Sequence, residues 1–211
     1  MTDESHWSRW HDGYADPGSD LSLRLTVVQS RLAEAVDRCP PGPVRIVSLC
    51  AGQAHDVVGA LAEHPRRSDV VGRLVELDAG NAEVARGSLS AAGLTGLTVT
   101  TDDAGSTDAC AGAVPSDVLL LCGIFGNVPD ADIAMTVANA SRLCAPAATV
   151  LWTRHRRSPD LTPTVRSWFR AAGFDEVAFD SPGPERYAVG TARLVREPLP
   201  YEPGLRLFAF R

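Results

Sequence analysis

The chain has 211 residues, of which 45% are hydrophobic and 22% are charged, and its formal net charge is −6. These values are typical of one globular domain, and the acidic balance argues against a broad surface for nucleic acid or anionic membranes. No apolar run approaches the roughly 20 residues that span a bilayer. Residues 1–6 lack the basic region and apolar core of a signal peptide, so we expect a cytoplasmic protein.

The cysteines show no metal-binding spacing. The five thiols form no Cys-x-x-Cys pair, and several lie in apolar runs: Cys39, Cys50, Cys110, Cys122 and Cys144. This pattern predicts reduced, buried thiols and argues against a zinc site or any other metal site.

The first 40 residues are predicted to form an N-terminal helical arm, which acts as a lid or cap on the domain over residues 41–211. Trp7, Trp10 and Tyr14 are spaced by three and four residues, so one helical turn would place them on one face. That face either packs on the domain or covers a site. Ser19 would then cap a helix over residues 20–38, which the segment 39–43, rich in proline, ends.

Strands and helices alternate along the rest of the chain. Apolar runs predict strands over 44–50, 71–77, 97–101, 117–122, 147–153, 174–180 and 186–194. Helices are predicted over 54–64, 80–92, 130–143 and 161–172, with a short one after residue 105. The alternation predicts an α/β fold: a doubly wound, mainly parallel sheet of about seven strands with helices on both faces.

Ligands of such sheets bind at the carboxyl ends of the strands, near the point where the strand order reverses. The first strand leads through small residues, among them Gly52, into a helix whose N-terminus carries Asp56. Small residues let a ligand approach the backbone, and the helix N-terminus favours negative charge. The loop is therefore either a cofactor loop or an ordinary strand-to-helix turn. Asp56 would hold an amino group or complement the helix dipole.

Acidic residues follow the second and third strands. Asp78 is placed to accept hydrogen bonds from ribose hydroxyls, and Asp103 from an adenine amino group, although either residue could instead cap a helix. Glu76 is expected to face the other side of its strand from Asp78. His55 is interpreted as a residue at the start of a helix.

Together these segments resemble class I S-adenosylmethionine-dependent methyltransferases. The resemblance covers residues 44–154 and rests on the order and spacing of five segments: 46–54, 74–86, 103–104, 116–123 and 142–151. It implies a Rossmann-like domain, S-adenosylmethionine as cofactor and a small-molecule acceptor. There are departures: Ser48 stands where the family has an acid, and Cys50 and Ala54 stand where two glycines are usual.

The resemblance and the positions of residues at the strand ends and on the arm give the candidate site residues. Cofactor binding falls to Cys50, Ala51, Gly52, Gln53, Asp78, Asp103, Ala104, Cys122 and Gly123. The substrate pocket falls to Phe125, Asn127 and Arg154. The candidate catalytic residues are His155, His11 and Tyr14. Arginines flank His155, so they would lower its pKa and keep it a neutral base, or they would grip an anionic substrate.

Two other functions remain open. A protein that binds S-adenosylmethionine without catalysis would explain the altered glycine loop. An NAD(P)-dependent oxidoreductase would require a fuller Gly-x-Gly-x-x-Gly loop and a separate substrate domain, which this chain lacks. The acceptor, the kind of atom methylated and the oligomeric state are not determined by the sequence.

Overall fold

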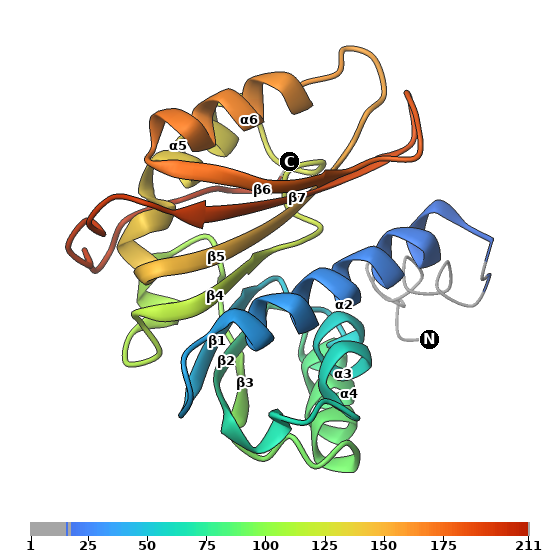
Figure 1. Ribbon diagram of the computed structural model, residues 1–211, viewed down its shortest axis with the longest axis vertical. Helices are drawn as coiled ribbons and strands as arrows, with labels where there is room; N and C mark the ends of the chain where they lie inside the picture. The colour runs from blue at the N-terminus through green and yellow to red at the C-terminus, as the bar shows by residue number, and fades with distance from the viewer. Residues whose placement is uncertain (1–15, 17, 211) are drawn as a thin grey trace.

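The computed structural model describes residue 16 and residues 18–210, which form one open seven-stranded sheet flanked by helices (Figure 1). The strands are β1 (Val44–Leu49), β2 (Val70–Glu76), β3 (Leu97–Thr101), β4 (Ser116–Leu121), β5 (Cys144–His155), β6 (Phe174–Asp180) and β7 (Tyr187–Leu194). Their order is β3-β2-β1-β4-β5-β7-β6, in which only β7 runs antiparallel to its neighbours β5 and β6. The predicted mainly parallel sheet of about seven strands is therefore confirmed.

Helices cover both faces of the sheet, as the strand–helix alternation predicts. One face packs against α2 (Asp20–Arg38), α3 (His55–Leu61) and α4 (Ala79–Ala91), and the other against α5 (Asp130–Asn139) and α6 (Thr162–Ala171). Side chains alternate accordingly: Leu74 belongs to the core on the first face and Val75 to the core on the second. The order reverses between β1 and β4, which places the expected ligand site at their carboxyl ends.

Local sequence explains the bounds of α2. Ser19 caps the helix by accepting a 3.1 Å hydrogen bond from the Ser22 N–H, and Cys39 and Pro40 follow its last residue, Arg38. The helix expected over 130–143 instead becomes α5 followed by a 3₁₀ helix over Ala140–Leu143. The arm with Trp7, Trp10, His11 and Tyr14 lies outside the described residues.

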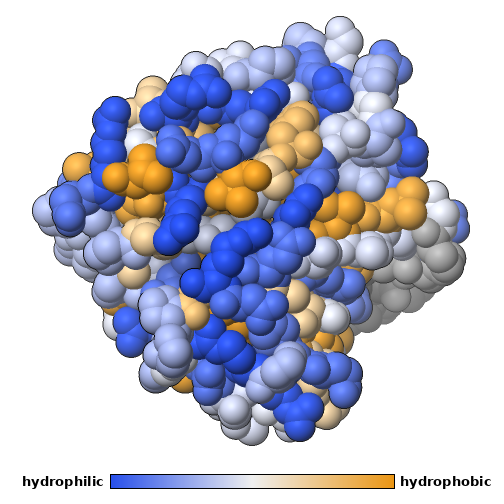
Figure 2. Space-filling model, in the orientation of Figure 1, coloured by the Kyte–Doolittle hydropathy of each residue, from blue (hydrophilic) through white to orange (hydrophobic). Residues whose placement is uncertain are grey.

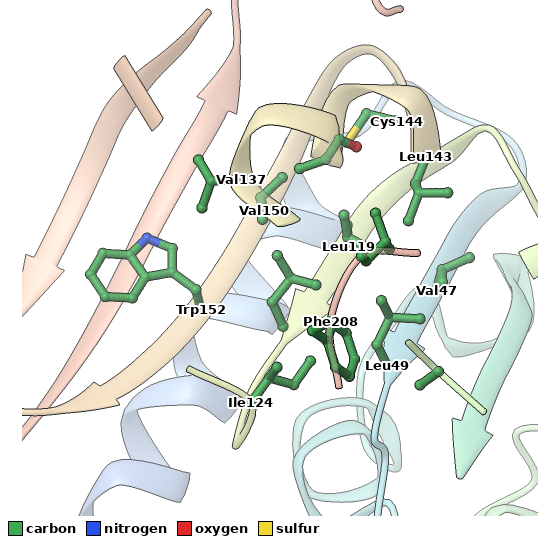
Figure 3. Close-up of a cluster of buried hydrophobic side chains, with 14 of the residues drawn as sticks. Val47, Leu49, Leu119, Ile124, Val137, Leu143, Cys144, Val150, Trp152 and Phe208 are labelled. Atoms are coloured by element: carbon green, nitrogen blue, oxygen red, sulfur yellow. The ribbon is translucent and has the colours of Figure 1, made fainter. Parts of the chain in front are cut away.

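A C-terminal segment completes the second face. The connection from β3 to β4 contains only a 3₁₀ helix, Thr107–Cys110, and the buried side chains of Leu207 and Phe208 occupy the face beside it. Figure 3 shows Phe208 among Leu49, Leu119 and Ile124. We call residues 201–210 the C-terminal strap.

The molecular surface agrees with the composition of the chain. On the face shown in Figure 2, hydrophilic residues surround several separate hydrophobic groups. No helix among the described residues is long and apolar enough to cross a membrane.

Candidate functional site

A cavity of about 330 Å³ lies at the carboxyl ends of the first four strands. Its walls come from α2, the loop after β1, the residues that follow β2, β3 and β4, and the end of the C-terminal strap. The volume lies within the roughly 300–1,000 Å³ typical of small-molecule sites. The cavity is at the reversal of strand order, where open parallel sheets bind ligands.

The structure brings the predicted cofactor-binding residues together. All nine line this cavity: Cys50, Ala51, Gly52, Gln53, Asp78, Asp103, Ala104, Cys122 and Gly123. They lie on four separate segments of the chain, which meet because parallel strands end at the same edge of the sheet. Their contact with a cofactor stays a prediction.

The loop after β1 has an unusual backbone. Cys50, Gly52 and Ala54 have φ angles of 57°, 55° and 62°, so every second residue is in the left-handed region. That region favours glycine, and a residue with a side chain is strained there by about 1–3 kcal/mol. The loop therefore keeps a conformation suited to three glycines although it contains only one.

Glu76, the last residue of β2, joins this loop to the end of its strand. One carboxylate oxygen accepts a 2.7 Å hydrogen bond from the Gly52 N–H, and the other accepts one of 2.9 Å from the Asp78 N–H. Glu76 also lines the cavity. The expectation that it faces away from Asp78 is wrong, because residues two apart in a strand lie on the same side. Leu77, between them, is 65% exposed.

Asp78 has a structural role that the sequence left open. Its Oδ1 accepts a 2.8 Å hydrogen bond from the Asn81 N–H and caps α4. Its side chain lies in the cavity wall beside Glu76. Two carboxylates therefore stand at the end of β2, and the ribose role of Asp78 stays a prediction.

Asp103 is held by the C-terminal strap. Its Oδ2 lies 2.5 Å from Nη1 of Arg206, and its Oδ1 accepts a 2.8 Å hydrogen bond from the Gly105 N–H. Partial burial disfavours the charged carboxylate, but the contacts with Arg206 and Gly105 outweigh that effect and lower the pKa of Asp103. Asp103 does not cap the 3₁₀ helix that follows, because Ser106 does.

The cavity wall also contains Asp56, from α3, and Arg24, from α2. Burial raises the pKa of Asp56 to about 6, although the Val57 N–H donates to its Oδ1 and Arg24 attracts its charge. Burial, followed by the charge of Asp56, also raises the pKa of Cys122. The sequence did not point to Arg24, because no local sequence pattern shows that α2 lies beside the ends of the strands.

Of the predicted substrate-pocket residues, Asn127 alone lines the cavity, where its side-chain amide donates a 2.8 Å hydrogen bond to the Gly123 carbonyl. The expectation for Phe125 is wrong. Its side chain is fully buried in the core, with its ring centroid 6.1 Å from that of Trp152. Arg154 is also behind the wall, where it donates to the Phe125 carbonyl and its Nη2 lies 3.8 Å from Asp130.

His155, the last residue of β5, does not line the cavity either. A Cβ atom on Gly126 would lie 3.3 Å from its ring, and its Nδ1 is buried with no hydrogen-bond partner among the described residues. Burial, then the charges of Arg154 and Arg157, lower the pKa of His155. His55, by contrast, lines the cavity, and burial lowers its pKa too. The catalytic role of His155 stays a prediction, as do those of His11 and Tyr14, which lie outside the described residues.

No protein-family model and no curated protein matches this sequence. Solved structures do match it. Magnesium protoporphyrin IX methyltransferase (ChlM) from Synechocystis PCC 6803, with bound S-adenosylmethionine, has a TM-score of 0.69 at 11% identity. That alignment covers 90% of this chain and 92% of the enzyme.

Two further structures are similar. A possible exported protein from Bordetella parapertussis has a TM-score of 0.65 at 15% identity, over 82% of this chain and 68% of its own. An O-methyltransferase family protein from Burkholderia thailandensis has a TM-score of 0.61 at 16% identity, over 89% of this chain. The match spans only 62% of the Burkholderia protein. Together with the sheet order and the position of the cavity, these similarities show that this chain has the fold of class I S-adenosylmethionine-dependent methyltransferases.

Proposed function

We propose that this protein is an S-adenosylmethionine-dependent methyltransferase that acts on a small molecule. The observation that carries the proposal is the cavity at the reversal of strand order, in which Glu76 holds the strained loop against the end of β2. The fold, and the S-adenosylmethionine bound in the similar Synechocystis enzyme, support the choice of cofactor.

The residues of the cavity fit the chemical groups of this cofactor. The carboxylate of Glu76 suits ribose hydroxyls, and Asp103 and Ala104 follow β3, at the nucleobase end. At the other end, Arg24 suits the carboxylate of the amino-acid group and Asp56 suits its ammonium. Four carboxylates line the walls, which favours a cation: Asp56, Glu76, Asp78 and Asp103.

Little further chemistry is required of the protein. The cofactor, when bound, supplies a methyl group on a positively charged sulfur. The chain must align the acceptor, exclude water and, for a protonated acceptor, receive a proton. Side chains of α2, including Leu25 and Val28, form an apolar wall, consistent with the first 40 residues acting as a cap.

Calorimetry tests the cofactor. We expect S-adenosylmethionine and its product S-adenosylhomocysteine to bind, and NAD to give no heat. The absence of heat with both adenosyl compounds at millimolar concentration would sink the proposal. Heat with NAD alone would favour an oxidoreductase.

Two histidines are candidates for proton transfer, and substitutions can distinguish between them. His55 lines the cavity and His155 lies behind Gly126, and the lowered pKa of each keeps the imidazole neutral at pH 7. His55→Gln and His155→Gln should both retain affinity for S-adenosylhomocysteine. Whichever variant slows turnover at saturating cofactor identifies the base, and normal turnover in both variants excludes both residues.

Binding without catalysis is the second candidate. It is favoured by the departures at Cys50 and Ala54, and by Ser48, which is 1% exposed and does not line the cavity. Tight binding of S-adenosylmethionine with no methyl transfer to a broad panel of phenols, amines and carboxylic acids would support it.

A further inference from the structure

The C-terminal strap lies on the second face of the sheet, beside residues that are about 100 positions away in the sequence. The Thr107 N–H donates to the Leu205 carbonyl at 3.0 Å, and the Leu207 N–H donates to the Gly105 carbonyl at 2.8 Å. Ser106 and Arg206 form an antiparallel bridge. The strap therefore runs directly beside the residues that follow β3.

Its end is attached to α5 on the other side. The Thr136 hydroxyl donates to the Leu207 carbonyl at 3.0 Å, and the Ala209 N–H donates to Oδ2 of Asp132 at 2.8 Å. These bonds position the backbone up to the residue before Phe210. The close fit extends to Gly105, where any Cβ atom would collide with the Phe208 carbonyl oxygen.

The two aromatic residues at the end of the strap have different environments. Phe208 is 1% exposed and belongs to the core, whereas Phe210 is 39% exposed and lines the cavity. Their rings meet edge to face, with centroids 5.7 Å apart. Phe208 and the backbone hydrogen bonds therefore anchor the strap, and the ring of Phe210 is not part of the buried core.

The strap also acts on Asp103, because Arg206 pairs with one oxygen of that carboxylate. The other oxygen is bonded to Gly105, whose carbonyl holds the strap. Both oxygens of the acid at the nucleobase end are therefore oriented by the strap or by the residue on which the strap rests.

We propose that the C-terminal strap forms the nucleobase wall of the cofactor site. In this arrangement the ring of Phe210 packs against the adenine, and Arg206 is a positioning residue that aims Asp103 at the amino group of the base. The inference rests on the proposed function for the identity of the cofactor. Stacking of a base on an aromatic side chain contributes about 1–3 kcal/mol.

The first experiment is calorimetry with S-adenosylhomocysteine and with adenosine. Phe210→Ala should weaken both ligands by about tenfold or more, with the melting temperature of the free protein unchanged, and Phe210→Tyr should restore binding. Leu199→Ala, which removes another exposed apolar side chain outside the cavity, is the control with unchanged affinity.

Equal affinity of wild type and Phe210→Ala for both ligands would overturn the role of Phe210. A failure of the wild-type protein to bind S-adenosylhomocysteine at all would instead overturn the proposed function, and the nucleobase wall with it.

The second experiment tests Arg206 through ligand selectivity. S-inosylhomocysteine carries an oxygen in place of the adenine amino group. Wild type should prefer S-adenosylhomocysteine, and Arg206→Gln should reduce that preference severalfold, while Arg206→Lys keeps most of it. A merely structural Arg206 would weaken both ligands equally, and an unchanged ratio of affinities would overturn its positioning role.

Discussion

The two ends of the cavity are built differently. At the proposed nucleoside end, Glu76 accepts hydrogen bonds from Gly52 and Asp78, and Asp103 is held by Gly105 and Arg206. Both carboxylates are held in place by neighbours before any ligand arrives, and the contacts of Asp103 lower its pKa. This end is organised in advance, so a ligand loses little free energy in ordering it.

At the opposite end the protein holds unfavourable states. Burial raises the pKa of Asp56 to about 6, and Ala54, at the start of the same helix, has a left-handed backbone. Such strain and desolvation concentrate at functional sites. A ligand with an ammonium group would stabilise the charged Asp56. We infer that the proposed nucleoside end selects the ligand by hydrogen bonds from groups already in place, and that the other end contributes affinity through charge.

The largest expected effect comes from Glu76→Gln at the nucleoside end. The amide places a donor against one of two backbone N–H groups and removes the charge that suits ribose hydroxyls. Calorimetry should show losses of about 10- to 100-fold for both S-adenosylhomocysteine and 5′-methylthioadenosine, which lacks the amino-acid group. Glu83→Gln, on the exposed side of α4, is the matched control. A loss confined to one ligand would contradict the assignment.

Arg24→Gln should separate the two ends. We expect affinity for S-adenosylhomocysteine to fall by about tenfold, because a charged hydrogen bond to the ligand carboxylate is lost. Affinity for 5′-methylthioadenosine should not change. Arg38→Gln, on the same helix but outside the cavity, should bind both ligands normally. Equal losses of affinity for the two ligands would mean that Arg24 does not bind the carboxylate of the amino-acid group.

Asp56→Asn should stabilise the free protein at neutral pH. Because the folded pKa is raised, the native state binds more protons than the unfolded state between about pH 4 and 6, so Asp56 destabilises the fold as pH rises through that window. The variant should match wild type near pH 4 and exceed it by up to about 3 kcal/mol at pH 7.5, measured by denaturant unfolding. Its affinity for S-adenosylhomocysteine should fall. A variant no more stable at pH 7.5 would refute the burial argument.

The smallest effect is expected for Ala54→Gly in the strained loop. Glycine relieves the left-handed backbone, so the free energy of unfolding should rise by about 0.5–1 kcal/mol. Ala60→Gly, in α3, should instead lower the free energy of unfolding by a similar amount, because glycine destabilises a helix. If both variants destabilise the protein, the φ angle of Ala54 stores no strain.

Sequence patterns predicted the fold well where the signal is local. The bounds of α2, β3 and β6 are those expected from apolar periodicity and from the capping and breaking residues around them. The sequence also predicted that the nine candidate cofactor-binding residues lie together, since the ends of parallel strands meet at one edge of the sheet. Phe125 was misplaced because nothing in the sequence tells whether a side chain after a strand turns inward or outward.

The sequence by itself determined the mainly parallel sheet, the edge that carries the cavity and the residues of the loop after β1. Only the tertiary structure decided that Arg24 and Phe210 line the cavity and that Arg206 pairs with Asp103. Periodicity and turn residues report interactions within a few positions of the chain, whereas Arg206 and Asp103 are 103 residues apart. Contacts over such a separation exist because the core brings the strap to the uncovered face beside β4, where burial of Leu207 and Phe208 stabilises it.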